Sequence, residues 1–435
     1  MKLTQKKVLI LGGIHHMIDV VNTAKKMGIY TIVTDNIDGS PAKMYADKSY
    51  DISTADIDAL CDMARSENVA GIFTAFEDIN TWNALLLCEK LQLPFYATKK
   101  QLEIASNKNQ FKAFCRQYGV PVVEEFKVEG NLTEQTIAQM TFPVIIKPVD
   151  SYASKGITIC HDAKEAKSGY EKALQFSKSK TAIIEPFIDN SYGVQFFYTI
   201  QKGQVVLNGV VDRYVYKQTK DAPPLPVAMA FPSRHQDHYI KTVDPKVRKM
   251  IQGMGIENGL VFIQALFENE SYYIYEMGFR FSGEQHYKII EKQTGINLLE
   301  MMLDFSVGNP IEKYDISTFD DGYMPRPSYN LPILLNTGTI KEIIGLEKVE
   351  AMPEVVSNVM TRKVGDTIDV IGAYSQMLGR FNIVAQSTDE LNQTIKNIQE
   401  TLRVVSTRET EMISVKFCPV TGTCTNNQQT ISQFR

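Results

Sequence analysis

Apolar and polar residues alternate in different ways along the chain, and the first hundred residues form one region. Short apolar runs at 8–11, 30–34 and 71–75 alternate with segments at 57–66 and 81–91 in which apolar residues recur at helical spacing. Runs of this length predict buried strands, and the spacing predicts amphipathic helices. Because strands that alternate with helices favour a parallel sheet, we expect a doubly wound α/β domain.

Polar residues follow several of these predicted strands. In doubly wound sheets the carboxyl ends of the strands meet at one edge, and ligands bind there. The residues that we expect at this edge are His15, His16, Asp35, Glu77 and Asp78. Each of them alone is equally compatible with a solvated loop. The Gly12-Gly13 turn followed by Asp35 is half of a dinucleotide fingerprint, but the turn lacks a third glycine, so the signal for NAD is weak.

The middle region is organised around the apolar run at 142–149, which contains Lys147. A strand this apolar belongs inside a sheet, where an unpaired ammonium group is costly, so Lys147 needs an anionic partner or a route to water. The loop that follows, 150–157, is small and polar, and its backbone amides can close over a phosphate. Together these features indicate a nucleotide site. The alternative is a lysine that extends to water from the end of a strand, beside an ordinary hairpin.

The rest of the middle region predicts an α+β domain, because antiparallel hairpins occur among helices. The two expected hairpins pair 195–201 with 205–211, and 260–268 with 271–276. Shorter strands are expected at 94–96, 125–128 and 181–184, and a polar, proline-containing loop at 217–238.

The last region, from about residue 310, has short strands separated by turns. A strand at 381–385 and a helix at 388–402 are the clearest elements, so we expect a small α+β domain here. The end of the chain is rich in Thr, Asn, Gln and Ser, and we expect 413–435 to be a disordered tail.

Composition and charge narrow the range of partners. The chain has 435 residues, of which 44% are hydrophobic and 22% charged, as in ordinary globular proteins, and it is long enough for two or three domains. A net charge of −4 gives no basic field that would hold nucleic acid. No apolar run is long enough to cross a membrane. The six cysteines are scattered and form neither a disulfide framework nor a zinc motif, so we expect a cytoplasmic protein.

Three features combine along the chain. Lys108 precedes Lys147 by about 40 residues, Glu185 follows it by about as many, and a predicted hairpin ends in Glu276-Met277-Gly278-Phe279-Arg280. In order, spacing and residue type, the chain resembles the ATP-grasp ligases, in the branch of biotin carboxylase, phosphoribosylglycinamide synthetase, carbamoyl phosphate synthetase and bacterial L-amino-acid ligases. The resemblance covers almost the whole chain. It implies an N-terminal α/β domain at 1–104, an ATP-grasp domain of two α+β lobes at 105–310 and a C-terminal α+β domain at 311–412.

The resemblance also implies an ATP site. Lys108 and Lys147 are similar to the two lysines that grip the phosphates, one from each lobe. The loop that closes over the phosphates is matched by Ser151, Tyr152, Ser154, Lys155 and Gly156. Glu185, Phe187 and Ile188 match the adenine hinge, and Gln195 takes the place of a ribose-binding glutamate.

A metal site is implied next to the phosphates, for Mg²⁺ or, as an alternative, Mn²⁺. Oxygen ligands suit Mg²⁺, which bridges phosphates and offsets their repulsion. Glu276 matches one of the family's two metal-binding glutamates, but the other position is Gln264, and Gly278 stands where relatives carry an asparagine. The expected site is therefore less negative than that of its relatives, which leaves open a weakened or specialised enzyme.

The substrate side of the site follows the hairpin. Arg280 matches the arginine that stabilises the acyl-phosphate and binds a carboxylate, so we expect it, with Lys147, to be catalytic. The polar loop that contains Ser282, Gly283, Glu284 and His286 is expected to line the substrate pocket. His286 is a candidate general base, and a structural histidine is the alternative.

The implied activity is an ATP-dependent carboxylate–amine ligase. ATP phosphorylates a carboxylate, an amine or another nucleophile attacks the acyl-phosphate, and ADP and phosphate leave. Two alternatives stay open: an enzyme that activates bicarbonate, like carboxylases and carbamoyl phosphate synthetase, and an ATP-binding protein without catalysis. The expected partners are small-molecule substrates, and neither nucleic acid nor a membrane is expected. Because relatives often form dimers, the analogy also suggests a homodimer.

Overall fold

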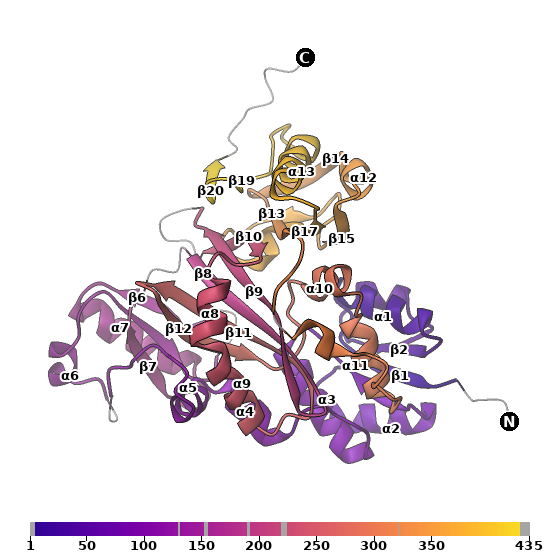
Figure 1. Cartoon of the computed structure of the whole chain (residues 1–435), viewed down its shortest axis with the longest axis horizontal. Coiled ribbons are helices and arrows are strands. Elements are labelled where there is room, and N and C mark those ends of the chain that lie inside the picture. The colour runs from indigo at the N-terminus through magenta and orange to yellow at the C-terminus, as the bar shows by residue number, and fades with distance from the viewer. Residues whose placement is uncertain are drawn as a thin grey trace.

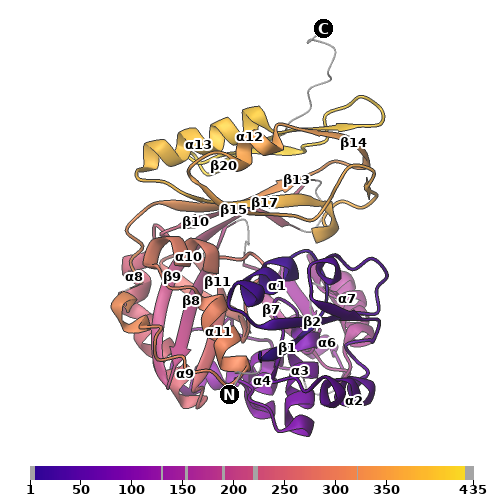
Figure 2. The same ribbon diagram turned by 90° about the vertical axis from the view of Figure 1, so that its right-hand side faces the viewer.

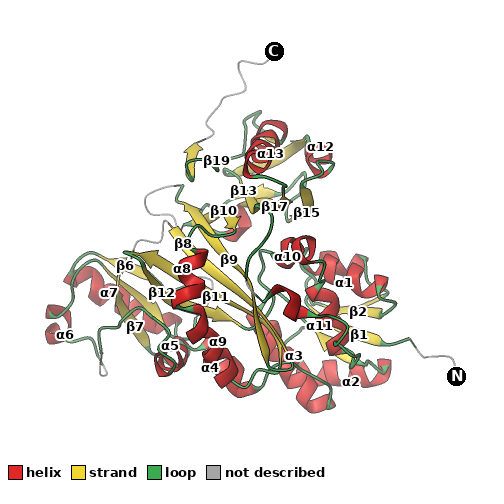
Figure 3. Ribbon diagram, viewed as in Figure 1, coloured by secondary structure: helices red, strands yellow, loops and turns green. Residues whose placement is uncertain are grey.

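The computed structural model describes residues 5–128, 131–151, 155–188, 192–218, 224–320 and 322–426. Figure 1 shows the N-terminal α/β unit in indigo, a small lobe around α6 and α7, a long central sheet and a C-terminal unit in yellow. The secondary structure in Figure 3 is mixed throughout, as the sequence predicts. No helix in the described ranges is long and apolar enough to cross a membrane.

The N-terminal unit is doubly wound. Its parallel sheet has the order β3-β2-β1-β4, and helices cover both faces. Val8 and Ile10 pack in the same core as helix α1, whereas Leu9 and Leu11 pack with α2 and α3, as the two-residue period of a strand requires. The elements are β1 (Lys7–Leu11), α1 (Met17–Lys26), β2 (Tyr30–Thr34), β3 (Lys48–Tyr50), α2 (Ile57–Glu67), β4 (Gly71–Phe73) and α3 (Asp78–Leu91).

Two helices lead from this unit into the small lobe. Helix α4 (Lys99–Ser106) begins with a capping box between Thr98 and Gln101, and α5 (Lys108–Gln117) begins at the Asn107 side chain. The lobe is an antiparallel sheet of order β6-β5-β7 with helices α6 and α7 in its core. Its elements are α6 (Glu134–Ala138), β5 (Val144–Pro148), β6 (Thr158–Cys160), α7 (Ala163–Phe176) and β7 (Ala182–Pro186).

An eight-stranded antiparallel sheet, of order β12-β11-β8-β9-β10-β13-β17-β15, forms the centre of the molecule. It continues past residue 310, because β10 pairs with β13, so the third region shares a sheet with the second. The elements up to residue 310 are β8 (Tyr192–Gln201), β9 (Gln204–Tyr216), β10 (Leu225–Phe231), α8 (Gln236–Thr242), α9 (Asp244–Gly253), β11 (Asn258–Glu268), β12 (Ser271–Gly278), α10 (Tyr287–Thr294) and α11 (Leu298–Ser306).

The C-terminal unit lies above the other two in Figure 2, with helices α12 and α13 on its outer face. Phe381 and Ile383 of β17 point into its core. Its elements are β13 (Ser328–Leu334), β14 (Gly338–Ile344), α12 (Leu346–Glu350), β15 (Val355–Met360), β16 (Thr367–Ile368), β17 (Met377–Val384), α13 (Thr388–Thr401), β18 (Arg403–Ser406), β19 (Val415–Cys418) and β20 (Thr423–Asn426).

The prediction of a polar loop at 217–238 is wrong for two segments of this range. Strand β10 lies within it and helix α8 begins in it, and every residue of β10 is buried. Prolines make this segment look like a loop, since proline lacks the N–H that a central strand donates. A register shift between Pro226 and Ala228 in the pairing with β9 accommodates the missing donor.

Three other expectations are also wrong. Residues 94–96 form no strand, and at 125–128 only Phe126 makes an isolated bridge, to Ile184. The tail expected from 413 is folded as far as 426, because β19 pairs with β20 and Phe417 packs against Tyr214 and Tyr329. The segment is mostly polar, so its sequence pattern does not indicate that Phe417 packs into the core. Residues 427–435 lie outside the described ranges.

Candidate active site

Three polar side chains form a row across neighbouring strands of the central sheet. Gln264 of β11 lies directly opposite Gln195 of β8 on one side and Glu276 of β12 on the other. Residues directly opposite each other in a sheet point to the same face. Gln195 is buried, and its amide nitrogen and oxygen have no hydrogen-bond partner among the described residues, whereas Glu276 is exposed. An unpaired buried amide at this place is the sign of a ligand contact.

A β-bulge brings Tyr275 into the same row. The pairing of β11 with β12 shifts between Gln264 and Ala265, so that Tyr275 is an extra residue on β12. Its hydroxyl donates a hydrogen bond to Gln264 Oε1 (2.9 Å), and Lys147 Nζ lies 6.0 Å from the centre of its ring. The expected phosphate-binding lysine of the small lobe therefore faces the expected metal ligands of the large sheet.

Lys108 lies near Lys147. Its Nζ donates to the backbone oxygen of Ser151 (2.9 Å), at the start of the expected phosphate loop, and burial lowers the pKa of Lys108. Gly156 has a φ of +79°, and a Cβ there would lie 2.7 Å from Phe176, so this end of the loop requires glycine. Lys155 is exposed. The expected contacts Tyr152 and Ser154 lie outside the described ranges.

Glu185 is held in a buried ion-pair cluster. Its Oε2 lies 2.6 Å from Lys147 Nζ and its Oε1 2.6 Å from Lys112 Nζ, and its exposed fraction is 2%. Burial alone raises the pKa of a carboxyl group, but the two lysines outweigh it and lower the pKa of Glu185. Both carboxylate oxygens are therefore bound by lysines, and the part of Glu185 in the adenine hinge stays a prediction. Phe187 and Ile188 follow it half-buried.

Two side chains with oxygen atoms lie where metal ligands are expected, and the space for a third is filled. Glu276 offers a carboxylate and Gln264 an amide oxygen, whereas a Cβ on Gly278 would lie 2.1 Å from the ring of Phe262. Phe262 thus fills the place where relatives carry an asparagine. The described residues contain no group of three or more His, Cys, Asp or Glu side chains that could hold a metal ion. Glu276 and Gln264 fit one Mg²⁺ that takes its remaining ligands from phosphates and water.

Arg280 connects the hairpin to the N-terminal unit. Its guanidinium makes two hydrogen bonds to Asp78, Nε to Oδ1 at 2.6 Å and Nη2 to Oδ2 at 2.9 Å, and lies over the ring of Phe262. Asp78 is one of the residues expected at the ligand-binding edge of the N-terminal sheet. Asp35 also lies at that edge, where it accepts a hydrogen bond from the Gly13 amide.

The loop after Arg280 is folded between the three units. Ser282 donates to the Glu284 carboxylate, and the Glu284 carbonyl accepts a hydrogen bond from Asn330 of the C-terminal unit (2.8 Å). A Cβ on Gly283 would meet no atom within 4 Å, so the loop is open at this point. Ser282, Gly283 and Glu284 therefore lie against the C-terminal unit, and their part in a substrate pocket stays a prediction.

His286 does not line a pocket, which corrects the expectation. It is 1% exposed, its Nε2 lies 3.1 Å from Met229 Sδ, and its ring packs edge-on against Phe197 and Phe231. Burial lowers the pKa of His286 to about 3. A neutral histidine that packs against two aromatic rings, with Glu284 and Arg380 nearby, has the structural role that was its alternative.

Two buried cations were not singled out by the sequence. Lys112 lies one turn after Lys108 on the buried face of α5. A lysine on the buried face of a helix needs an anionic partner, and this is the signal by which the sequence could have indicated a charge cluster. Arg380 lies in the apolar strand β17, is 4% exposed, and its Nε and Nη1 have no hydrogen-bond partner within the described ranges. Asn382, two residues further on the same face, reaches the backbone oxygen of Gln285. Arg380 thus faces the 282–285 loop.

Comparisons with known proteins show which family and fold the chain is similar to. Residues 107–314 match the family model of the carbamoyl-phosphate synthase L chain, ATP binding domain. The formate-dependent phosphoribosylglycinamide formyltransferase of Wolinella succinogenes is 26% identical over 203 residues, which cover 46% of this chain and 52% of that protein. The chain therefore spans about half the length of the curated relatives it matches.

Solved structures resemble nearly the whole fold. Phosphoribosylglycinamide synthetase from Anaerococcus prevotii superposes with a TM-score of 0.74 at 19% identity, over 92% of this chain and 100% of that one. The L-amino acid ligase from Bacillus licheniformis gives 0.72 at 20% identity, over 92% and 99%. At such identities the likeness shows the fold. Together with the match of residues 107–314 to the family model, it shows that the chain has the ATP-grasp fold and that residues 107–314 belong to the ATP-grasp family.

Proposed function

We propose that this protein is an ATP-dependent ligase, which activates a carboxylate as an acyl-phosphate and couples it to an amine or another nucleophile. The observation that carries this proposal is the contact across the two lobes. Lys147 of the small lobe faces Tyr275, which holds Gln264 beside Glu276. A cation and two oxygen ligands on opposite walls suit a polyphosphate with its metal ion.

Each residue has a defined part in the proposed site. Lys108 and Lys147 neutralise phosphate oxygens, and Glu276 and Gln264 hold the Mg²⁺ that accompanies ATP. The bound metal offsets the negative charge of the phosphates. Arg280 orients the carboxylate through its planar guanidinium, while Asp78 holds that group in place.

The second substrate is proposed to enter beside the 282–284 loop. Among the described residues, Nε and Nη1 of Arg380 have no hydrogen-bond partner, and they lie on the C-terminal side of this loop. A buried guanidinium with two such donors suits an anionic group of the substrate, in addition to the Glu284 carboxylate near it. The names of the relatives support small carboxylates and amines as substrates, since one relative is formate-dependent and one fold neighbour ligates amino acids.

Product analysis tests the proposal. The purified protein is incubated with Mg²⁺ and ATP, and separately with formate, bicarbonate and pooled amino acids, beside the Lys147→Ala variant. We expect ADP and phosphate to appear only with a substrate pool and to be lost in the variant. AMP and pyrophosphate would contradict acyl-phosphate chemistry.

ATP binding without turnover is a second candidate, and one observation favours it. Phe262 fills the place of a third metal ligand, and Gln264 supplies an amide where relatives supply a carboxylate. In that case the protein binds ATP in calorimetry but releases no ADP with any pool. Response to bicarbonate alone, with no amino acid, would favour the carboxylase-like alternative.

A further inference from the structure

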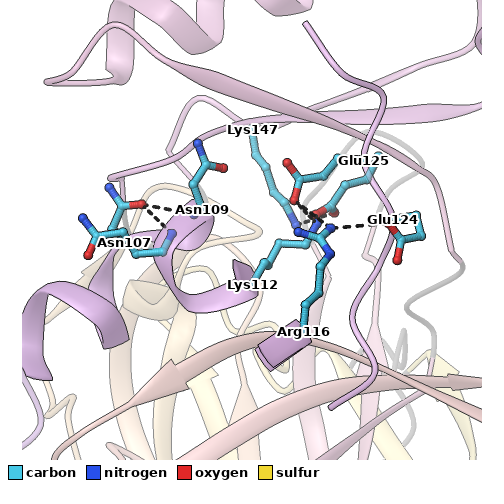
Figure 4. Close-up of polar contacts among 9 residues, drawn as sticks. Asn107, Asn109, Lys112, Arg116, Glu124, Glu125 and Lys147 are labelled. Atoms are coloured by element: carbon cyan, nitrogen blue, oxygen red, sulfur yellow. Dashed lines mark hydrogen bonds and ion pairs between the residues drawn. The ribbon is translucent and has the colours of Figure 1, made fainter. Parts of the chain in front are cut away.

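Lys112 is a fully buried cation to which the proposed reaction gives no part. It is 1% exposed, lies on α5 one turn beyond Lys108, and makes two close ion pairs. Its Nζ is 2.6 Å from Glu185 Oε1 and 2.7 Å from Glu125 Oε1 (Figure 4). Arg116 contacts Glu125 as well (3.5 Å), from the exposed side of the cluster. A lysine is buried this deeply only when its charge is compensated.

Glu185 joins Lys112 to Lys147. One of its carboxylate oxygens holds each ammonium group, at 2.6 Å in both cases. The charges of Lys112, Lys147, Glu125 and Glu185 therefore cancel within the cluster. A lysine has three N–H donors, so Lys147 can turn part of its ammonium towards a phosphate while Glu185 remains nearby.

The attraction of Glu185 for Lys147 depends on how many cations share that carboxylate. With Lys112 present, one of the two carboxylate oxygens of Glu185 is bonded from the other side. Without Lys112, the buried carboxylate would rely on Lys147 alone, and the cluster would carry a net negative charge. An uncompensated buried charge is costly, and this one would also repel the phosphates of ATP.

We propose that Lys112 is a positioning residue for nucleotide binding: it neutralises Glu185 and so leaves Lys147 available to the phosphates of ATP. This inference rests on the proposed function, because it requires that the protein binds ATP. Lys112 itself touches no phosphate in this account. Its effect passes through Glu185, which makes the inference testable with pairs of variants.

Isothermal titration calorimetry with Mg²⁺-ATP and no second substrate tests the inference. We expect Lys112→Met to weaken binding at least about tenfold and Lys112→Arg, which keeps the charge, to change it less than about threefold. Glu185→Gln removes the charge that Lys112 neutralises. In that background, Lys112→Met should therefore have almost no further effect on the affinity.

The matched control is Glu125→Gln, which removes the other partner of Lys112 and leaves Glu185 paired. Its affinity for ATP should be unchanged or tighter. Equal affinities of the folded Lys112→Met variant and the natural protein would overturn the inference. So would a further loss of about fivefold or more on adding Lys112→Met to Glu185→Gln, and this comparison still decides if Lys112→Met alone does not fold. If the natural protein itself binds no ATP, the proposed function fails instead.

Discussion

The ring of Phe262 occupies the space next to Gly278, so closely that a Cβ on residue 278 would lie 2.1 Å from it. The two residues face each other in the pairing of β11 with β12. An asparagine at 278 cannot simply be added to this site, because the aromatic ring must first move. The glycine at 278 is therefore coupled to the aromatic ring at 262.

Replacing Gly278 by Asn should destabilise the protein. Overpacking of a buried site costs about 1–3 kcal/mol, and we expect a loss of the free energy of unfolding in that range. Adding Phe262→Ala to Gly278→Asn should restore part of the lost free energy of unfolding, because the smaller side chain leaves room for the asparagine. Thermal unfolding measures both, with Gly283→Ala as a control, since a Cβ there meets no atom within 4 Å. A Gly278→Asn variant as stable as the natural protein would contradict the packing described.

Gln264→Glu should lower the Mg²⁺ concentration that ATP binding requires. The new carboxylate adds a hard, anionic oxygen beside Glu276 and can still accept the hydrogen bond of Tyr275. Titration of Mg²⁺ at fixed ATP measures the shift, with Glu268→Gln, at the far end of β11, as a control. An unchanged Mg²⁺ requirement would show that residue 264 does not contact the metal.

Arg380→Met should separate stability from function. Arg380 makes no ion pair within 4 Å among the described residues, and its burial costs desolvation that the nearby Glu284 carboxylate offsets, so its removal should change the free energy of unfolding by less than about 2 kcal/mol. The KM of the carboxylate or amine substrate should rise at the same time. Arg248→Met is the contrasting case, because Arg248 pairs with Asp244 and Asp320, and it should lose stability. A clear loss of stability in Arg380→Met would instead mark Arg380 as structural.

His286 should make the protein less stable in mild acid. Its pKa is lowered to about 3 by burial, so below the unfolded value of 6.5 the unfolded state binds more protons. Stability should then fall by about 2 kcal/mol between pH 7 and pH 5 through this residue alone. His286→Phe should remove that part of the pH dependence in thermal unfolding, whereas His161→Gln, at an exposed position, should not. Identical pH profiles for the natural protein and His286→Phe would contradict the burial of a neutral histidine.

Much of the fold is predictable from the sequence because the patterns are strong where a segment buries one or both faces. Strand β2 has the predicted bounds, and α13 ends one residue earlier than predicted. Strand β10 is missed because prolines conceal a fully buried run, and β19 because its anchor, Phe417, finds its aromatic partners in β9 and β13. Partners that are distant in sequence leave no local pattern.

For the site, the sequence indicates which residue types matter but not how they are paired. Lys147 and Glu185 were both expected at the nucleotide site, yet their ion pair and its extension to Lys112 depend on strand register and helix placement. The bidentate pair of Arg280 with Asp78 spans two units, and no local pattern predicts it. Arg380 was missed for the same reason, since its neighbours come from a loop about a hundred residues away.

The transfer of oxygen from the carboxylate to phosphate tests acyl-phosphate formation most directly. The substrate pool that supports ADP release is prepared with its carboxylate labelled by ¹⁸O, and the released phosphate is analysed by mass spectrometry. If the carboxylate attacks the γ-phosphate and the amine then displaces phosphate, one ¹⁸O atom must appear in each phosphate formed. Phosphate without label, at the same yield of ADP, would contradict the proposed reaction.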